Sequence, residues 1–141
     1  KNLIVTMLDV GQGDSLMIAF PNNKGNILID TGGIVNFTKN NYEISTSTII
    51  PYLKSIGIKK INYLVLTHGD YDHMGSSINL IDNFNIENVI FNIGTYNELE
   101  KDLIKILKDS KYSNFISIEM KNSNNLEGTK ETIGYVRRLF K

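Results

Sequence analysis

The 141-residue sequence predicts a layered α/β (α+β) domain in which a mixed sheet is flanked by helices. Two observations predict this fold class. Three short apolar segments separated by turn residues come first, a pattern typical of consecutive β-strands. From about residue 47, helical patterns then alternate with apolar strand patterns, which is typical of layered α/β proteins. The chain is long enough to form one domain, residues 1–141, with its own hydrophobic core.

Three strands are predicted within the first 30 residues. Residues 3–8 are apolar and rich in β-branched side chains, so we expect them to form a buried strand, and residues 15–20 and 26–30 form the next two. The connections at 9–14 and 21–25 are short and rich in turn residues, so the three strands are predicted to form an antiparallel meander. The first connection could also cradle a phosphate through its backbone N–H groups, although such a segment is more often only a tight turn.

Helices and strands alternate in the rest of the chain. A polar loop to about Thr46 is followed by a helix that Ser47 caps, that has Pro51 in its first turn and that Gly57 ends. The remaining predicted elements are a strand at 61–66, a short helix at 75–84, a strand at 88–92, an amphipathic helix at 97–110 that Asn97 begins, and a strand at 115–118. The segment 121–141 predicts no definite element.

The composition limits the chemistry that the chain can perform. Fifteen Lys and Arg residues balance 15 Asp and Glu residues, which gives no indication of a strongly charged nucleic-acid or membrane surface. The absence of cysteine means that any metal must be bound by His, Asp, Glu or backbone oxygen. No apolar run reaches the roughly 18 residues that would span a bilayer. Because the first residue is Lys1 and not Met, we expect a segment of a longer polypeptide.

The segment Thr67-His68-Gly69-Asp70-Tyr71-Asp72-His73 combines both histidines of the chain with two carboxylates, directly after a predicted strand. Alternate residues of an extended loop point to one side, so His68, Asp70 and Asp72 can converge, and His73 can reach a second position if the loop turns. These ligands suit zinc, manganese or iron, and the metal would favour hydrolysis of an ester or phosphate. The alternative is that the histidines only cap or hydrogen-bond an ordinary loop. The clustering of four potential ligands favours a metal site.

Several motifs resemble one enzyme superfamily. His68-x-Asp70-x-Asp72-His73 resembles the His-x-His-x-Asp-His signature of the metallo-β-lactamase superfamily, with Asp in place of the second His. Leu28-Ile29-Asp30-Thr31-Gly32-Gly33 resembles an earlier strand end of that superfamily, which contains an Asp. Residues 8–15 and 50–58 are similar to the hydrolase-like domain of the ComEC family of DNA-uptake competence proteins.

This resemblance covers about residues 3–118 and implies an αββα sandwich with the metal at one edge of its two sheets. It implies that His68 and Asp70 serve one divalent ion, zinc or manganese, and that Asp72 and His73 serve a second. Asp72 would also be the catalytic residue that holds or deprotonates the attacking water. Asp30 and Thr67 would support the ligands from behind, as metal sites usually require; the alternative is that Asp30 is itself a ligand.

The sequence departs from the superfamily after His73. The expected downstream ligands are a His, an Asp and a final His, but no histidine follows His73, and Asp82, Asp102 and Asp109 fall on predicted helices. We therefore expect the chain to be the N-terminal half of the sandwich, to bind metal weakly and to have little or no activity by itself.

Three functions remain open at this point. The first is hydrolysis of phosphodiester bonds, with DNA entering a bacterial cell as the substrate that the resemblance implies; the domain would then lie outside the cytoplasmic membrane, and otherwise in the cytoplasm. The second is a stand-alone hydrolase of another ester, thioester or lactone, since one fold supports many chemistries. The third is a non-catalytic binding or assembly module with an incomplete metal site, which the exposed surface of a half-domain would drive to form homo-oligomers.

Overall fold

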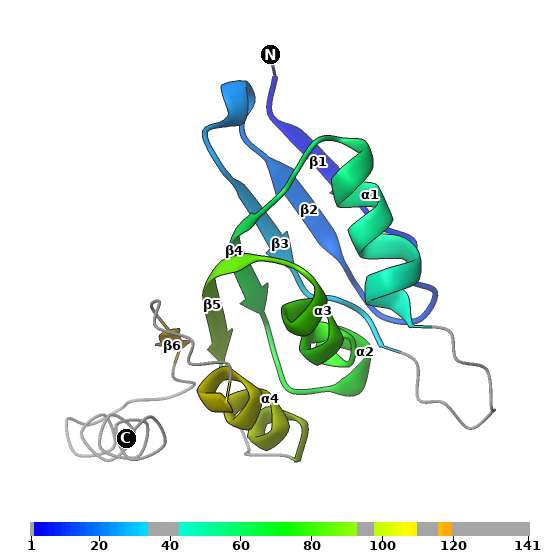
Figure 1. Cartoon of the computed structure of the whole chain (residues 1–141). Helices are drawn as coiled ribbons and strands as arrows, with labels where there is room; N and C mark the ends of the chain where they lie inside the picture. The colour runs from blue at the N-terminus through cyan, green and yellow to red at the C-terminus, as the bar shows by residue number, and fades with distance from the viewer. Residues whose placement is uncertain (1, 34–42, 93–97, 110–115, 120–141) are drawn as a thin grey trace.

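The structure, a computed structural model, describes residues 2–33, 43–92, 98–109 and 116–119 (Figure 1). The strands are β1 (Ile4–Met7), β2 (Leu16–Ala19), β3 (Asn26–Ile29), β4 (Ile61–Leu66), β5 (Ile86–Asn92) and β6 (Ile116–Glu119). The helices are a 3-10 turn (Pro21–Asn23), a π-helix (Ser45–Ile49) that continues into α1 (Ile50–Ser55), then α2 (Tyr71–Met74), α3 (Ser77–Asn83) and α4 (Glu98–Asp109). None of these described helices has the length and apolar character needed to cross a membrane.

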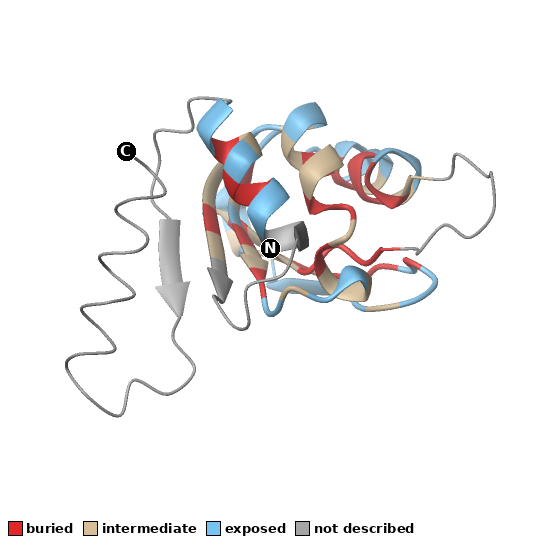
Figure 2. Ribbon diagram, turned by 90° about the horizontal axis from the view of Figure 1, so that it is seen from below, coloured by how far each residue is buried: buried red, intermediate tan, exposed pale blue. Residues whose placement is uncertain are grey.

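The six described strands form one mixed sheet in the order β1 to β6. β1, β2 and β3 pair antiparallel, whereas β3, β4, β5 and β6 pair parallel. Parallel neighbours need a crossover connection, and crossovers that all advance in one direction with the usual right hand place their helices on the same face. Figures 1 and 2 show the longer helices α1, α3 and α4 on one face of the sheet. The predicted α/β class, the mixed sheet and the meander are thus confirmed.

The hydrophobic core lies between the sheet and this helical layer, where Figure 2 places the buried positions. One row of side chains runs across four neighbouring strands, because the register pairs Met17 with Leu28, Leu28 with Leu64, and Leu64 with Val89. All four side chains are buried. Fully buried leucines of the helices complete the core: Leu53, Leu80, Leu103 and Leu107. The core therefore fixes the register of the strands that carry the site.

The opposite face of the sheet has no covering segment among the described residues. Successive strand residues point to opposite faces, so the residues between the core positions face this side. They include Val5, Met7 and Tyr63, with exposed fractions of 55%, 64% and 45%. The prediction that residues 3–8 form a buried strand is therefore wrong for β1. Among the described strands β1 has one neighbour, β2, so it forms the expected ladder without the expected burial.

Two predicted helices differ from the observed ones. Ser47 does not cap the first helix, because it lies inside the π-helix that begins at Ser45; Gly57, at φ +81°, ends that helix as predicted. The predicted helix at 75–84 is two helices, and α2 begins four residues earlier, inside the predicted metal loop. The loop before Glu43, the cap at Asn97 and the segment 121–141 lie wholly or largely outside the described residues.

Candidate metal centre

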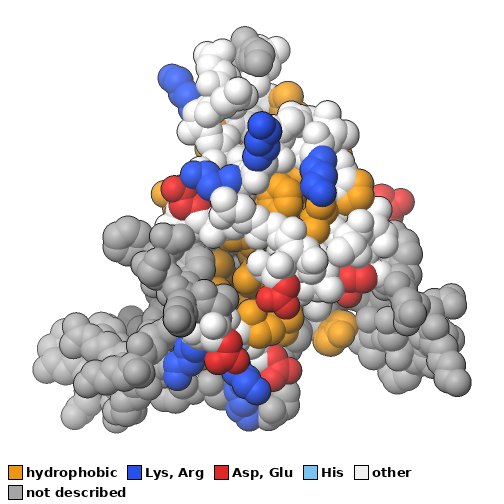
Figure 3. Space-filling view, viewed as in Figure 1, with side chains coloured by type: hydrophobic (Ala, Val, Ile, Leu, Met, Phe, Trp, Pro, Cys, Tyr) orange, Lys and Arg blue, Asp and Glu red, His pale blue; other side chains and the backbone are white. Residues whose placement is uncertain are grey.

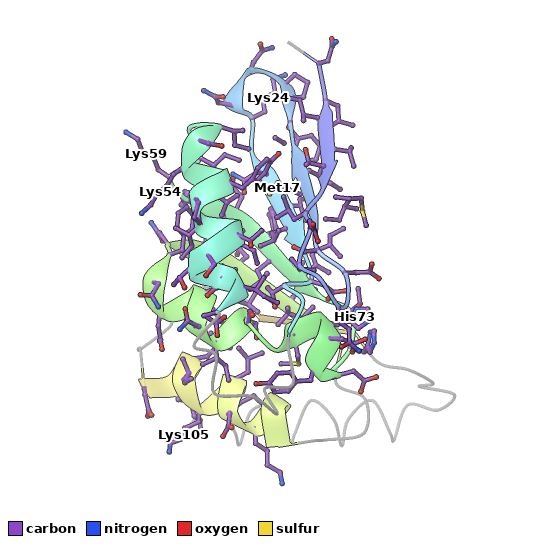
Figure 4. All side chains as sticks on the ribbon, turned by 90° about the vertical axis from the view of Figure 1, so that its right-hand side faces the viewer. Met17, Lys24, Lys54, Lys59, His73 and Lys105 are labelled. Carbon is purple, nitrogen blue, oxygen red and sulfur yellow. The ribbon has the colours of Figure 1, made fainter. Side chains whose placement is uncertain are left out.

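The Thr67–His73 segment lies at the carboxyl end of β4, beside the carboxyl end of β3. Because the two strands are parallel neighbours, residues that follow them meet at one edge of the sheet. The backbone N–H of Asp30 continues the ladder by donating to the carbonyl of Val65 over 2.8 Å. Figure 4 labels His73 at this edge, far from Lys24 in the β2–β3 turn. Residues 37 positions apart, Asp30 and Thr67, are thereby brought into contact.

Asp30 is the buried centre of the site, with only 3% of its surface exposed. Its Oδ1 accepts the backbone N–H of Thr67 at 2.8 Å, and its Oδ2 accepts the Thr67 hydroxyl at 2.7 Å. The same Oδ2 lies 3.0 Å from Nδ1 of His73. Asp30 has φ +56°, a left-handed conformation that Asp tolerates better than most residues. Three donors on one carboxylate offset the cost of burying its charge.

When the two imidazole rings are neutral, this network determines which of their nitrogens hold the protons. A carboxylate only accepts hydrogen bonds, so His73 must donate Nδ1–H to Asp30, which leaves the lone pair on its Nε2. Thr67 gives its only hydroxyl proton to Asp30, so its oxygen accepts from Nδ1 of His68, 2.9 Å away. The lone pair of His68 is then also on Nε2. The two rings are in contact, with centroids 3.7 Å apart.

Each of these free nitrogens has one carboxylate near it. Nε2 of His68 lies 3.6 Å from Oδ2 of Asp70, and Nε2 of His73 lies 3.8 Å from Oδ2 of Asp72. Ligand bonds to zinc are about 2.0–2.2 Å long, so atoms at these separations can bind a common ion. Among the described residues, however, no group of three or more His, Asp or Glu is arranged to hold a metal. The donors are of the right chemistry for a divalent ion, but they are incomplete in number.

The predicted convergence of His68, Asp70 and Asp72 is not what the structure shows. The extended segment ends at Asp70, whose carbonyl accepts the N–H groups of His73 and Met74 and so begins α2. Asp72 and His73 therefore lie on a helical turn. The turn places the ring of His73 against that of His68, so the pairs His68–Asp70 and His73–Asp72 meet at the two rings.

Three glycines, Gly13, Gly33 and Gly75, allow close backbone contacts around α2. A Cβ added at Gly13 would overlap the carbonyl oxygen of Asp72, and one at Gly33 would overlap that of Tyr71 and approach Gly75. The loops after β1 and β3 thus pack directly on the backbone of α2. This contact accounts for Gly13 without a bound phosphate. The glycines were visible in the sequence, but their partner was not.

Comparison with known proteins agrees with this geometry. Residues 8–139 match the metallo-beta-lactamase superfamily. ComE operon protein 3 of Bacillus subtilis (strain 168) is 29% identical over 130 residues, which cover 87% of this chain and 16% of that protein. Competence protein ComA of Neisseria gonorrhoeae is 34% identical over 71 residues, or 50% of this chain and 9% of that protein. The chain thus spans a sixth or less of these relatives. The predicted resemblance to the superfamily is confirmed, and the two relatives support the predicted ComEC-like relationship.

Proposed function

Because this chain belongs to the metallo-β-lactamase superfamily, we propose that it is the domain of a metal-dependent hydrolase that cleaves phosphodiester bonds. The observation that carries the proposal is the network in which Asp30 orients both histidines. A loop that only caps a helix has no need of a buried carboxylate behind two imidazole rings, whereas such support is usual behind metal ligands. The names of the two competence relatives favour DNA as the phosphodiester.

The proposed roles follow the pairing of the side chains. His68 and Asp70 would contribute to one ion site, and Asp72 and His73 to a second, with zinc or manganese as the metal. A bound divalent ion would supply a Lewis acid for a phosphoryl oxygen. Asp72, 43% exposed in its side chain, would hold the attacking water and accept its proton. Asp30 and Thr67 are positioning residues, because they act through the histidines.

We further propose that this chain by itself binds metal weakly and turns over slowly. Each site has two donors among the described residues, whereas catalytic zinc sites usually have three protein ligands. If the DNA-uptake role applies to this chain, the domain would lie outside the cytoplasmic membrane of a bacterium.

A second candidate function is a non-catalytic binding or assembly module. Two observations favour it: the absence of a three-ligand group among the described residues, and the open apolar face of the described sheet. Under this alternative, the histidine pair is a remnant, and the open face carries the function.

Hydrolysis assays on the chain, supplied with excess Zn²⁺ or Mn²⁺, test the proposal. We expect slow, metal-dependent cleavage of bis(p-nitrophenyl) phosphate that falls to background in Asp72→Asn. The matched control is Asp82→Asn, an exposed carboxylate on α3, which should keep full activity. Faster cleavage of p-nitrophenyl acetate or a lactone would favour the other hydrolase class. Absence of bound metal and of turnover on every substrate would favour the module.

A further inference from the structure

A cavity of about 710 Å³ lies at the opposite end of the strands from the candidate metal centre. It is formed by the β2–β3 turn, the start of β4 and the residues that follow α1. β4 separates it from the histidines, and five residue steps of about 3.3 Å make this distance roughly 17 Å. The cavity is therefore a separate site, and the proposed hydrolysis makes no use of it.

The rim of the cavity combines three kinds of side chain. Phe20 and Ile56 offer apolar surface and are 41% and 44% exposed. Asn22 and Asn23 offer exposed amides, held on consecutive residues with φ near +58°. Lys59 offers an ammonium group. None of the described lining residues is acidic.

Lys59 carries the positive charge that is available to a ligand. Its neighbour Lys60 also lines the cavity, but its Nζ lies 3.0 Å from Oε2 of Glu87, outside the cavity. The hydrogen bond from Lys60 holds the pKa of Glu87 below its usual value, so this pair is charged and partly self-neutralised at neutral pH. Lys59 forms no ion pair with any described residue. Figure 3 shows lysine side chains around hydrophobic atoms near this end, and Figure 4 labels Lys59 there.

The polar groups of Asn26 and Asn62 on the floor of the cavity are already hydrogen-bonded within the protein. Asn26 and Asn62, on neighbouring strands, each accept the other's backbone N–H at their side-chain oxygen, over 3.0 and 3.1 Å. The Asn26 amide also donates to the carbonyl of Lys60 over 2.9 Å. A ligand would therefore be recognised by the aromatic ring, the amides and the ammonium group of the rim, above a preformed floor.

We propose that this cavity binds a nucleotide, with the base stacked on Phe20 and the phosphate at Lys59. The rim matches the three parts of a nucleotide. The ring of Phe20 can stack on the face of the base, the amides of Asn22 and Asn23 can donate to and accept from its edge, and the ammonium group of Lys59 can bind the phosphate. An acidic peptide would use the ammonium group but leave the aromatic ring without a role. The same chemistry is presented by a free nucleotide and by one residue of a single-stranded nucleic acid.

Titration by calorimetry or NMR, with a chelator present so that no metal binds phosphate at the histidines, tests this proposal. We expect thymidine monophosphate to bind at least about tenfold more tightly than thymidine or inorganic phosphate alone. The tetranucleotide of thymidine distinguishes the two sources: tighter binding than the mononucleotide indicates a nucleic-acid strand, and equal or weaker binding indicates a free nucleotide. Failure of all four probes to bind would overturn the proposal.

Variants locate the binding within the cavity. Phe20→Ala should weaken binding of thymidine monophosphate about five- to tenfold or more through lost stacking, while Phe20→Tyr should retain it. Lys59→Ala should weaken the binding of thymidine monophosphate and leave the binding of thymidine unchanged. Lys105→Ala, an exposed lysine on α4 labelled in Figure 4, is the matched control and should bind normally. Binding that survives both Phe20→Ala and Lys59→Ala would overturn the assignment. Asp72→Asn should not affect binding, which separates this result from the hydrolase proposal.

Discussion

At the scale of single residues, the carboxylate of Asp30 links both histidines of the candidate site. It contacts His73 directly and reaches His68 through the hydroxyl of Thr67. The donor and the acceptor of each hydrogen bond in this network are fixed. The carboxylate can only accept, the Thr67 hydroxyl has a single proton to donate, and a neutral imidazole ring donates from one nitrogen only. The proton positions on two rings therefore depend on one negative charge.

The first prediction concerns the tautomers of the two histidines. In Asp30→Asn, an amide NH₂ at the Oδ2 position would donate to His73 and Thr67, so both rings should shift their proton to Nε2. Thr67→Val should change the proton position on the His68 ring and leave that on the His73 ring unchanged. The ¹⁵N chemical shifts of the ring nitrogens in metal-free protein measure this, with the exposed Asp14→Asn as control. Zinc or manganese affinity should fall about 10- to 100-fold in Asp30→Asn. Ring shifts identical to those of the parent protein would contradict the network.

The second prediction compares two glycines that share a conformation but differ in surroundings. Gly11 and Gly13 have φ of +76° and +93°, so alanine is strained at both. A Cβ at Gly11 meets nothing within 4 Å, whereas one at Gly13 overlaps the backbone of Asp72. We expect Gly11→Ala to lower the free energy of unfolding by about 1 kcal/mol and Gly13→Ala by about 2 kcal/mol more. Urea denaturation measures both, and equal losses would show that the close contact does not matter.

At the scale of the elements, the sequence predicts best where local pattern decides the structure. The predicted strand 61–66 has the same boundaries as β4. The sequence marks both ends of this strand, because its residues are mostly apolar while polar residues precede and follow it. α2 was missed because its residues were interpreted as ligands of a loop, while the carbonyl of Asp70 nucleates a helical turn. The burial of β1 was overestimated because periodicity predicts a strand but not the number of its neighbours.

The third prediction concerns the contact between α1 and the edge strand. The hydroxyl of Tyr52 on α1 donates to Oγ1 of Thr6 on β1 over 2.7 Å. This bond ties the edge of the sheet to the helical layer, so Tyr52→Phe should lower the free energy of unfolding by about 1 kcal/mol. A double-mutant cycle with Thr6→Val should give a coupling energy of similar size. Tyr63→Phe, on the open face, is the control and should have little effect. A coupling energy near zero would contradict the bond.

At the scale of the whole molecule, the candidate site is a product of topology. Asp30 and Thr67 follow different strands, and only the parallel pairing of β3 with β4 brings them together. The sequence motifs predicted Asp30 as a supporting residue by resemblance, but they contained no information on strand order. The same topology leaves one sheet face without a described layer, and the sequence could not predict how apolar that face is across several strands.

The fourth prediction follows from this open face. Val5 and Met7 are more than half exposed on an edge strand, and Ile18 pairs with Val5 while Leu16 pairs with Met7, so the apolar surface continues into the sheet. Burial of such surface contributes about 25 cal/mol per Å², and an unpaired edge favours further strand pairing. We therefore expect copies of this chain to associate through this face.

Light scattering over a range of concentrations measures this association. The mass of the parent chain should rise with concentration towards at least that of a dimer, whereas the double variant Val5→Lys, Met7→Lys should stay monomeric, because two ammonium groups cannot be buried without partners. Ile56→Lys replaces an equally apolar side chain, 44% exposed on the helical side of the sheet, and should associate like the parent. A parent chain that is monomeric at every concentration would mean that the open face does not bind a second copy. Both variants add positive charge, but only the double variant alters the open face. If both lost association equally, net charge and not the open face would be the cause.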